Sequence, residues 1–190
     1  ILSGEGWSFD SNKRMLTLSN YTGSSSYTDT TDSIQIYSDG DLHITLLGKN
    51  SLFMESNYGI YCKGNLTISG NGSLDIANIS TGIYAGNEIT VEQARISIED
   101  ATAGIVANYG DVTIANASII MNNRILAKNG GDFRMNGGNV VASHIECSDF
   151  ILGSGNITAA IKTTGSIEVK DGIIDATLKN DNYDGIYFGI

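Results

Sequence analysis

A repeat in the middle of the chain constrains the fold more than any other feature of the sequence. Residues 57–80 read NYGIYCKGNLTISGNGSLDIANIS, and residues 81–100 read TGIYAGNEITVEQARISIED. Each segment contains Gly-Ile-Tyr, a short turn, an alternating apolar and polar run, a polar corner and a second alternating run. Self-similarity with a period of about 20 to 24 residues is typical of solenoid proteins, in which each repeat packs on its neighbours.

Apolar and polar residues alternate strictly within each copy. Leu66-Thr67-Ile68 and Leu74-Asp75-Ile76 place every second side chain on one face of an extended chain, which is the period of a half-buried β-strand. No helical spacing fits the pattern as well. The copies that share this pattern are 33–56, 57–80, 81–100, 101–123, 124–143, 144–160 and 161–180, with a fragment from 181.

Alignment of the copies gives two inward columns in the strand that opens each one. The first column is Ile36, Ile60, Ile83, Ile105, Ile125, Ile145, Ile161 and Ile186. These residues must face the interior, because a slip of one residue would turn the whole set to solvent. The second column holds small residues until the last copy: Ser38, Cys62, Ala85, Ala107, Ala127, Cys147 and Thr163. A column of branched aliphatic side chains beside a column of small side chains fills a narrow interior.

Two further strands follow in each copy. The inward column that begins the second strand is Leu42, Leu66, Ile89, Val112, Phe133, Phe150 and Ile167. In the third strand we align Leu52 and Met54 with Leu74 and Ile76 of the next copy. In the copy at 161–180, either Ile173 or Ile174 faces inward.

These columns predict an all-β fold, a single-stranded parallel β-helix (β-solenoid) with three short strands per coil. Residues 1–32 are predicted to form an N-terminal, hairpin-like cap followed by a polar loop, because Trp7-Ser8-Phe9 and Met15-Leu16-Thr17-Leu18 flank a polar turn. Such a cap covers strands that would otherwise be open edges. Residues 33–190 are predicted to form about seven coils plus a partial one.

Composition excludes several classes of function. The net charge is −10 with only 11 lysines and arginines, which disfavours nucleic-acid binding. No run of about 18 apolar residues exists, so no membrane span is expected. No signal peptide is visible at Ile1, and the chain opens and stops inside patterned sequence, so we expect a piece of a longer, processed protein.

The two cysteines are interpreted as packed thiols. Cys62 and Cys147 occupy the same small column four copies apart, which at the spacing of β-strands is about 19 Å. That separation is far beyond the reach of a disulfide bond. A free reactive or metal-binding role is the alternative.

The amino-acid sequence of the repeats resembles that of a known protein family. Residues 59–76, GIYCKGNLTISGNGSLDI, residues 163–176, TTGSIEVKDGIIDA, and the opening GWSFDSNKRMLTLSNYTG resemble right-handed parallel β-helix proteins of anaerobic gut and cellulolytic bacteria. More narrowly, the chain from Ser33 onward resembles the calcium-associated polysaccharide-binding β-helix family, whose fold is similar to that of pectate lyases. The resemblance implies a polysaccharide partner, calcium, and a secreted or cell-surface location in a bacterium.

Acidic and polar residues precede the second strand of each copy: Asp41, Asn65, Glu88, Asp111, Asp132, Asp149 and Ser166. Carboxylates one coil apart lie about 5 Å from each other and repel, and a divalent cation would relieve that repulsion. Oxygen ligands suit Ca²⁺, and the best candidate metal cluster is Glu88, Asp111, Asp132 and Asp149. The alternative is that Asp and Asn occur at corners because their side chains bond the local backbone.

An outward row of aromatic residues is the candidate carbohydrate-binding site. It comprises Tyr37, Tyr61 and Tyr84, and it continues as Val106 and Leu126. Exposed aromatic rings can hold a sugar by contact with its C–H face. The alternative is a structural side-chain ladder, or a surface covered by the loop 19–32.

The sequence therefore predicts a non-catalytic extracellular β-helix module that binds polysaccharide, or a host or cell-surface glycan, or that serves in adhesion at a bacterial surface. His43 and His144 lie four to five copies apart, so they cannot share one site. The acidic residues Asp75, Glu92, Glu99 and Asp100 are scattered and assemble no catalytic pair. The alternatives are a polysaccharide lyase or hydrolase of the same fold, and a ligand-free structural stalk.

Overall fold

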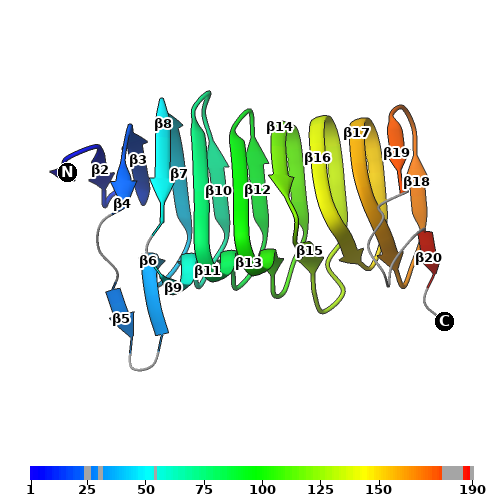
Figure 1. Cartoon of the computed structure of the whole chain (residues 1–190), viewed down its shortest axis with the longest axis horizontal. Coiled ribbons are helices and arrows are strands. Elements are labelled where there is room, and N and C mark those ends of the chain that lie inside the picture. Colours follow the sequence, from blue (N-terminus) through cyan, green and yellow to red (C-terminus); the bar gives the residue numbers. More distant parts are fainter. Residues whose placement is uncertain (24–26, 30–31, 54, 177–185, 189–190) are drawn as a thin grey trace.

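The computed structural model describes residues 1–23, 27–29, 32–53, 55–176 and 186–188, and it shows a chain wound into stacked parallel coils (Figure 1). All regular elements among these residues are β-strands. The same residues contain no helix that is long and apolar enough to cross a membrane. The predicted fold class, an all-β parallel β-helix, is confirmed.

The strands follow the order of the coils. The N-terminal strands are β1 (Leu2–Gly4), β2 (Trp7–Asp10), β3 (Met15–Ser19), β4 (Thr22–Gly23) and β5 (Tyr27–Asp29). The central strands are β6 (Asp32–Ser38), β7 (Leu42–Leu47), β8 (Lys49–Leu52), β9 (Ser56–Cys62), β10 (Leu66–Ser69), β11 (Ser73–Ala85), β12 (Ile89–Glu92), β13 (Arg95–Ala107), β14 (Val112–Met121) and β15 (Arg124–Ala127). The last strands are β16 (Phe133–Cys147), β17 (Phe150–Thr163), β18 (Ile167–Val169), β19 (Ile173–Asp175) and β20 (Ile186–Phe188).

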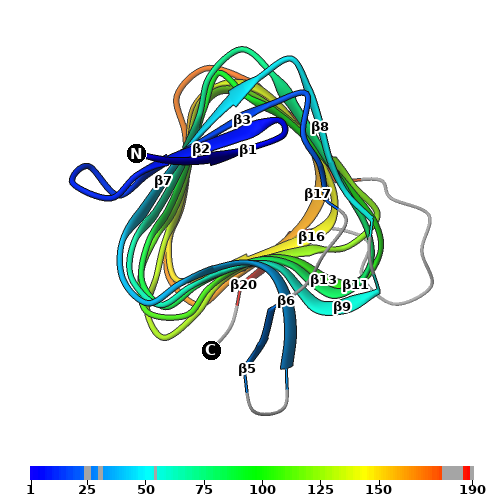
Figure 2. The same ribbon diagram turned by 90° about the vertical axis from the view of Figure 1, so that its left-hand side faces the viewer.

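The coils enclose one interior with three faces, seen along the axis in Figure 2. We name the faces by their first complete strands: the first face begins at β6, the second at β7 and the third at β8. Longer strands bend around corners, so β11 and β13 supply both the third and the first face. Each coil pairs in parallel with the next, which satisfies the backbone groups of both strands.

The isoleucine column of the first face is confirmed. Register pairs join Ile36, Ile60, Ile83, Ile105, Ile125, Ile145, Ile161 and Ile186 from coil to coil. The six members from Ile60 to Ile161 are fully buried. Complete burial of such a side chain contributes about 1.5–3 kcal/mol, so this column is a principal source of stability.

The second face also has the predicted register, from Leu42 through Ile167. Phe133 and Phe150 stack inside it with ring centroids 5.4 Å apart. The small column of the first face is buried as well, and both cysteines in it are free thiols. Burial raises the pKa of Cys147 to about 12, which keeps this thiol protonated and unreactive.

The predicted alignment of the third strand in the first copy is wrong by two residues. Leu52 pairs with Ile76, and the residue opposite Leu74 is Asn50, while Met54 lies outside the described residues. Asn50 is a polar side chain in the core, only 1% exposed. It is tolerated there because its Oδ1 accepts from the Tyr21 amide at 2.9 Å and its Nδ2 donates to two backbone carbonyls.

In the copy at 161–180, the structure shows which of Ile173 and Ile174 faces inward. Ile174 pairs with Ile157 and packs against the core, whereas Ile173 is 66% exposed. The inward residue is therefore Ile174.

A steric constraint explains why glycine precedes isoleucine in the Gly-Ile pairs. A Cβ on Gly82 would lie 2.6 Å from the carbonyl oxygen of Gly104, and a Cβ on Gly59 would lie 2.7 Å from that of Gly82. Neighbouring coils therefore approach too closely at Gly59 and Gly82 for any side chain. Gln93 and Asn116 turn the corner between the second and third faces in the left-handed conformation at φ 59° and 50°, and Asn78 and Asp100 adopt the same conformation between the third and first faces at φ 59° and 50°.

Antiparallel strands cover part of the N-terminal end. β1, β2 and β3 pair in antiparallel fashion, and Trp7, Phe9 and Leu16 pack against the core. β3 and β4 also pair in parallel with β7 and β8, so parts of the second and third faces already begin within residues 15–23. β5 and β6 form a hairpin that projects from the coils in Figure 2.

Candidate functional site

The three tyrosines predicted from the sequence lie in one stack on the outside of the first face. Tyr61 lies between Tyr37 and Tyr84, which come from the adjacent coils. The ring centroids of Tyr61 and Tyr84 are 4.8 Å apart with planes 11° from parallel. Those of Tyr37 and Tyr61 are 6.1 Å apart with planes 10° from parallel. The register of the coils thus brings these three rings together.

A fourth ring, Tyr58, belongs to the same cluster and was missed by sequence reasoning. Its edge meets Tyr61 at a centroid distance of 4.9 Å and Tyr84 at 5.8 Å. Strict alternation from Ile60 would turn Tyr58 inward, but the corner at Gly59 leaves it on the outside with the other rings. We name Tyr37, Tyr58, Tyr61 and Tyr84 the tyrosine ladder.

The ladder is anchored at one end. Tyr84 packs against a small outer cluster of Ala103, Val106 and Leu126, all three less than a tenth exposed. Burial raises the pKa of Tyr58 and of Tyr84 above that of a free phenol, so both hydroxyls stay protonated and can donate hydrogen bonds at neutral pH.

The stacking limits what the ladder can offer to a ligand. Both faces of the Tyr61 ring are covered, one by Tyr37 and one by Tyr84. A sugar therefore cannot lie flat on Tyr61, and the parts left for contact are ring edges and hydroxyl groups. The Lys63 Nζ lies 5.5 Å from the centre of the Tyr37 ring and adds a cation beside the stack.

The acidic column forms a chain of hydrogen bonds between coils. Asp111 Oδ1 accepts from the Asp132 amide at 2.9 Å, and Asp132 Oδ1 accepts from the Asp149 amide at 2.9 Å. Asp149 Oδ1 accepts in turn from the amide and the hydroxyl of Ser166. These bonds, that of the amide first, lower the pKa of Asp149. Glu88 takes part in this chain with its backbone: the Glu88 amide donates to Asn65 Oδ1 at 3.3 Å.

Arg134 forms ion pairs with two of the carboxylates predicted as metal ligands. Its Nε lies 3.0 Å from Asp111 Oδ2, and its Nη2 lies 2.5 Å from Asp132 Oδ2. The hydrogen bond to Asp111 raises the pKa of Arg134. Among the described residues, no three His, Cys, Asp or Glu side chains form a group that could hold a metal ion. The residues present thus relieve their own repulsion with amides and a guanidinium.

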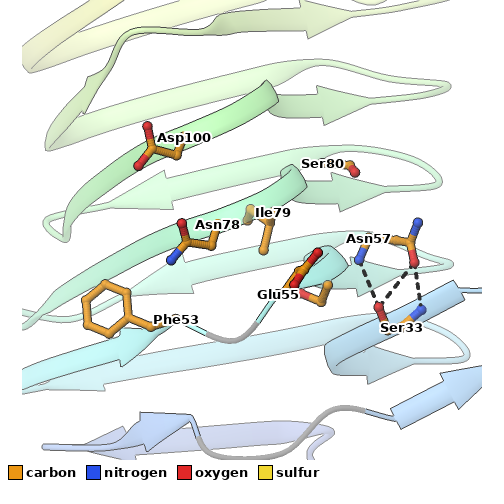
Figure 3. A pocket seen from close by; sticks show the side chains of 9 residues that line it. Ser33, Phe53, Glu55, Asn57, Asn78, Ile79, Ser80 and Asp100 are labelled. Atoms are coloured by element: carbon orange, nitrogen blue, oxygen red, sulfur yellow. Dashed lines mark hydrogen bonds between the residues drawn. The ribbon is translucent and has the colours of Figure 1, made fainter.

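A large hollow of the described surface lies elsewhere, at the corner that joins the third face to the first. It has a volume of about 810 Å³ and is lined by Phe53, Asn57, Asn78 and Asp100 among others (Figure 3). Sequence analysis did not predict this hollow, because it depends on where Phe53 and Asn57 lie, and neither position follows the repeat. The one available signal is Phe53, an aromatic residue at a polar corner.

The two histidines occupy separate environments, as the sequence predicts. His43 Nε2 lies 2.7 Å from Ser69 Oγ on the second face. His144 Nε2 lies 3.0 Å from Glu146 Oε1 on the first face. Each ring is held by a local polar neighbour.

Parallel coils around one buried interior define the class of this protein as a β-solenoid, or parallel β-helix. No family model matches the sequence, and no significant match to a curated protein or to a solved structure is found. A ligand has to be inferred from the surface of this chain.

Proposed function

We propose that this protein is a non-catalytic, extracellular β-helix module that binds polysaccharide or a cell-surface glycan at a bacterial surface, with the tyrosine ladder as its contact. The observation that carries the proposal is the stack of Tyr37, Tyr61 and Tyr84 on the outside of one face, with Tyr58 packed against it. Aromatic side chains gathered in this way on a surface are typical of binding sites.

The ladder suits an extended polymer better than a single sugar. Its rings repeat at the spacing of the coils, so their edges and hydroxyls form a row parallel to the solenoid axis. A glycan lying along the axis would meet a similar apolar edge and hydroxyl at each step. The rings are held by one another, so few rotamers have to be ordered on binding.

The direct test is retention by immobilised polysaccharide. Native affinity electrophoresis through gels that contain β-glucan, xylan, mannan or pectin would identify the polymers that retard the chain. For such a polymer, we expect the double variant Tyr61→Ala/Tyr84→Ala to lose most of the retardation. Tyr61→Phe keeps the ring and removes only the hydroxyl, so its retardation separates the contribution of the hydroxyl from that of the ring edge. Far-UV circular dichroism would verify that each variant folds.

The same assay separates the alternatives. A lyase or hydrolase would release unsaturated or reducing ends from the polymer during the incubation. A ligand-free stalk would migrate equally in every gel. Retardation that is unchanged in Tyr61→Ala/Tyr84→Ala would remove the ladder from the proposal.

A further inference from the structure

The hollow of Figure 3 continues as a furrow along the solenoid axis. Two smaller hollows adjoin it: Phe53 lines both the first and the second, and Ser97 and Glu99 line both the second and the third. The furrow begins beside Phe53 and ends beside Ile120, and these two apolar side chains are about half exposed. It thus crosses several successive coils on the third face.

The furrow holds hydrogen-bonding groups that the fold does not use. In the part of the chain that the structure describes, the side chains of Asn78, Ser80 and Asp100 make no hydrogen bond or ion pair. Asn57 Oδ1 accepts from the amide and hydroxyl of Ser33 at 2.9 and 3.2 Å, which leaves its two Nδ2 hydrogens for a ligand. Donors and acceptors are therefore both available along the hollow.

The charge of the furrow selects against anions. Glu55, Asp75, Glu99 and Asp100 line it, and none of its described lining residues is basic. A polyuronate or a sulfated polymer would bring further negative charge to these carboxylates. An uncharged sugar has no such penalty, and its hydroxyls can donate to carboxylates and accept from the Asn57 amide.

We propose that this furrow is a second binding site, for the chain of a neutral oligosaccharide, with Phe53 as the platform for one sugar ring. The ring of Phe53 is half exposed and lies at the edge of the hollow, where it can contact the C–H face of a pyranose. The amide and carboxylate groups of Asn57, Asn78 and Asp100 fix the hydroxyls of the following sugars. The site is separate from the tyrosine ladder and stands whether or not the ladder binds a ligand.

The experiment is isothermal titration calorimetry of the full chain with neutral pentasaccharides of glucose, mannose, xylose and N-acetylglucosamine. We expect at least one of them to bind. Phe53→Ala should weaken that binding roughly three- to tenfold, as expected for loss of a ring contact. Leu47→Ala is the matched control, because Leu47 is 42% exposed on β7 and does not line the furrow.

Two further variants give the proposal its sharpest tests. Tyr61→Ala/Tyr84→Ala removes any binding at the ladder, so Phe53→Ala is compared with Leu47→Ala in that background as well, where the remaining pentasaccharide binding should still fall three- to tenfold. Asp100→Asn removes one negative charge from the furrow and should reduce the discrimination against oligogalacturonate. The proposal is overturned if no neutral pentasaccharide binds, if Phe53→Ala binds as tightly as Leu47→Ala, or if only a cationic peptide such as oligolysine occupies the furrow.

Discussion

Asp132 Oδ1 accepts a hydrogen bond of 2.9 Å from the backbone amide of Asp149, in the next coil of the solenoid. The same relationship joins Asp111 to Asp132 and Asp41 to Asn65, at 2.9 and 2.7 Å. One side chain in each of these coils thus satisfies a backbone donor at the corner between the first and second faces. This use of the acidic column is local and structural.

Replacement of Asp132 tests that role. Asp132→Ala removes the acceptor, and Asp132→Asn keeps an oxygen in the same place, while both lose the ion pair with Arg134. We expect Asp132→Ala to be less stable than Asp132→Asn by about 1 kcal/mol, the usual contribution of one such hydrogen bond. Urea unfolding of the two variants measures the difference. Equal midpoints would show that the bond does not stabilise the fold.

Acid should weaken the contribution of Asp149. Hydrogen bonds from Ser166 lower the pKa of Asp149 in the folded chain, so folding favours the ionised form. Its stabilising effect is therefore complete above the pKa of the unfolded chain, at about pH 4, and is lost as the pH falls through the lower folded value.

The variant Asp149→Asn keeps a carbonyl acceptor that does not titrate. Melting temperatures measured between about pH 2 and pH 6 should fall more steeply for the native chain than for this variant. Parallel pH profiles for the two proteins would contradict the assigned shift.

The isoleucine column should dominate stability. Ile105 is fully buried, so Ile105→Ala leaves a cavity and should lower the free energy of unfolding by about 2–5 kcal/mol. Ile120→Ala is the matched control, because Ile120 is 52% exposed on β14 and its truncation should change stability by less than about 0.5 kcal/mol. Denaturant unfolding of both variants measures this contrast. A loss of similar size in the two would argue against a buried column at Ile105.

Calcium should not stabilise the native chain. A cation at Asp111 and Asp132 would have to displace the Arg134 guanidinium, which already pairs with both carboxylates. Melting in millimolar calcium and in EDTA should therefore give the same midpoint. Arg134→Ala leaves the two carboxylates one coil apart, and this variant should gain a calcium-dependent rise in melting temperature. A rise in the native chain would instead support the calcium site predicted from the sequence, because a ligand that binds only the folded state must stabilise it.

The fold could be predicted because the residues that specify it recur periodically in the sequence. Ile60, Ile83 and Ile105 recur at a nearly constant spacing within alternating runs, and only stacked coils bury all of them together. Asn50 could not be placed, because its core position depends on the Tyr21 amide, which comes from a part of the chain without the repeat. An asparagine two residues after a glycine, as Asn50 is after Gly48, is more typical of a corner.

The candidate sites were predictable only where they follow the repeat. Tyr37, Tyr61 and Tyr84 occupy one column, so their proximity follows from register. Tyr58 joins them through a corner that breaks the alternation, and alternation alone gives the wrong side. The furrow depends on residues at irregular corners, such as Phe53 and Asn57, whose positions no period specifies.

The most direct test of the proposed function observes the tyrosine rings themselves. Proton–carbon NMR spectra of tyrosine-labelled protein, assigned with single Tyr→Phe variants, would be recorded during titration with a polysaccharide that retards the chain. The ring signals of Tyr37, Tyr61 and Tyr84 should shift together in proportion to binding, while those of Tyr21, at the N-terminal end, should stay in place. Binding that saturates with the three ladder signals unmoved would contradict the proposed function.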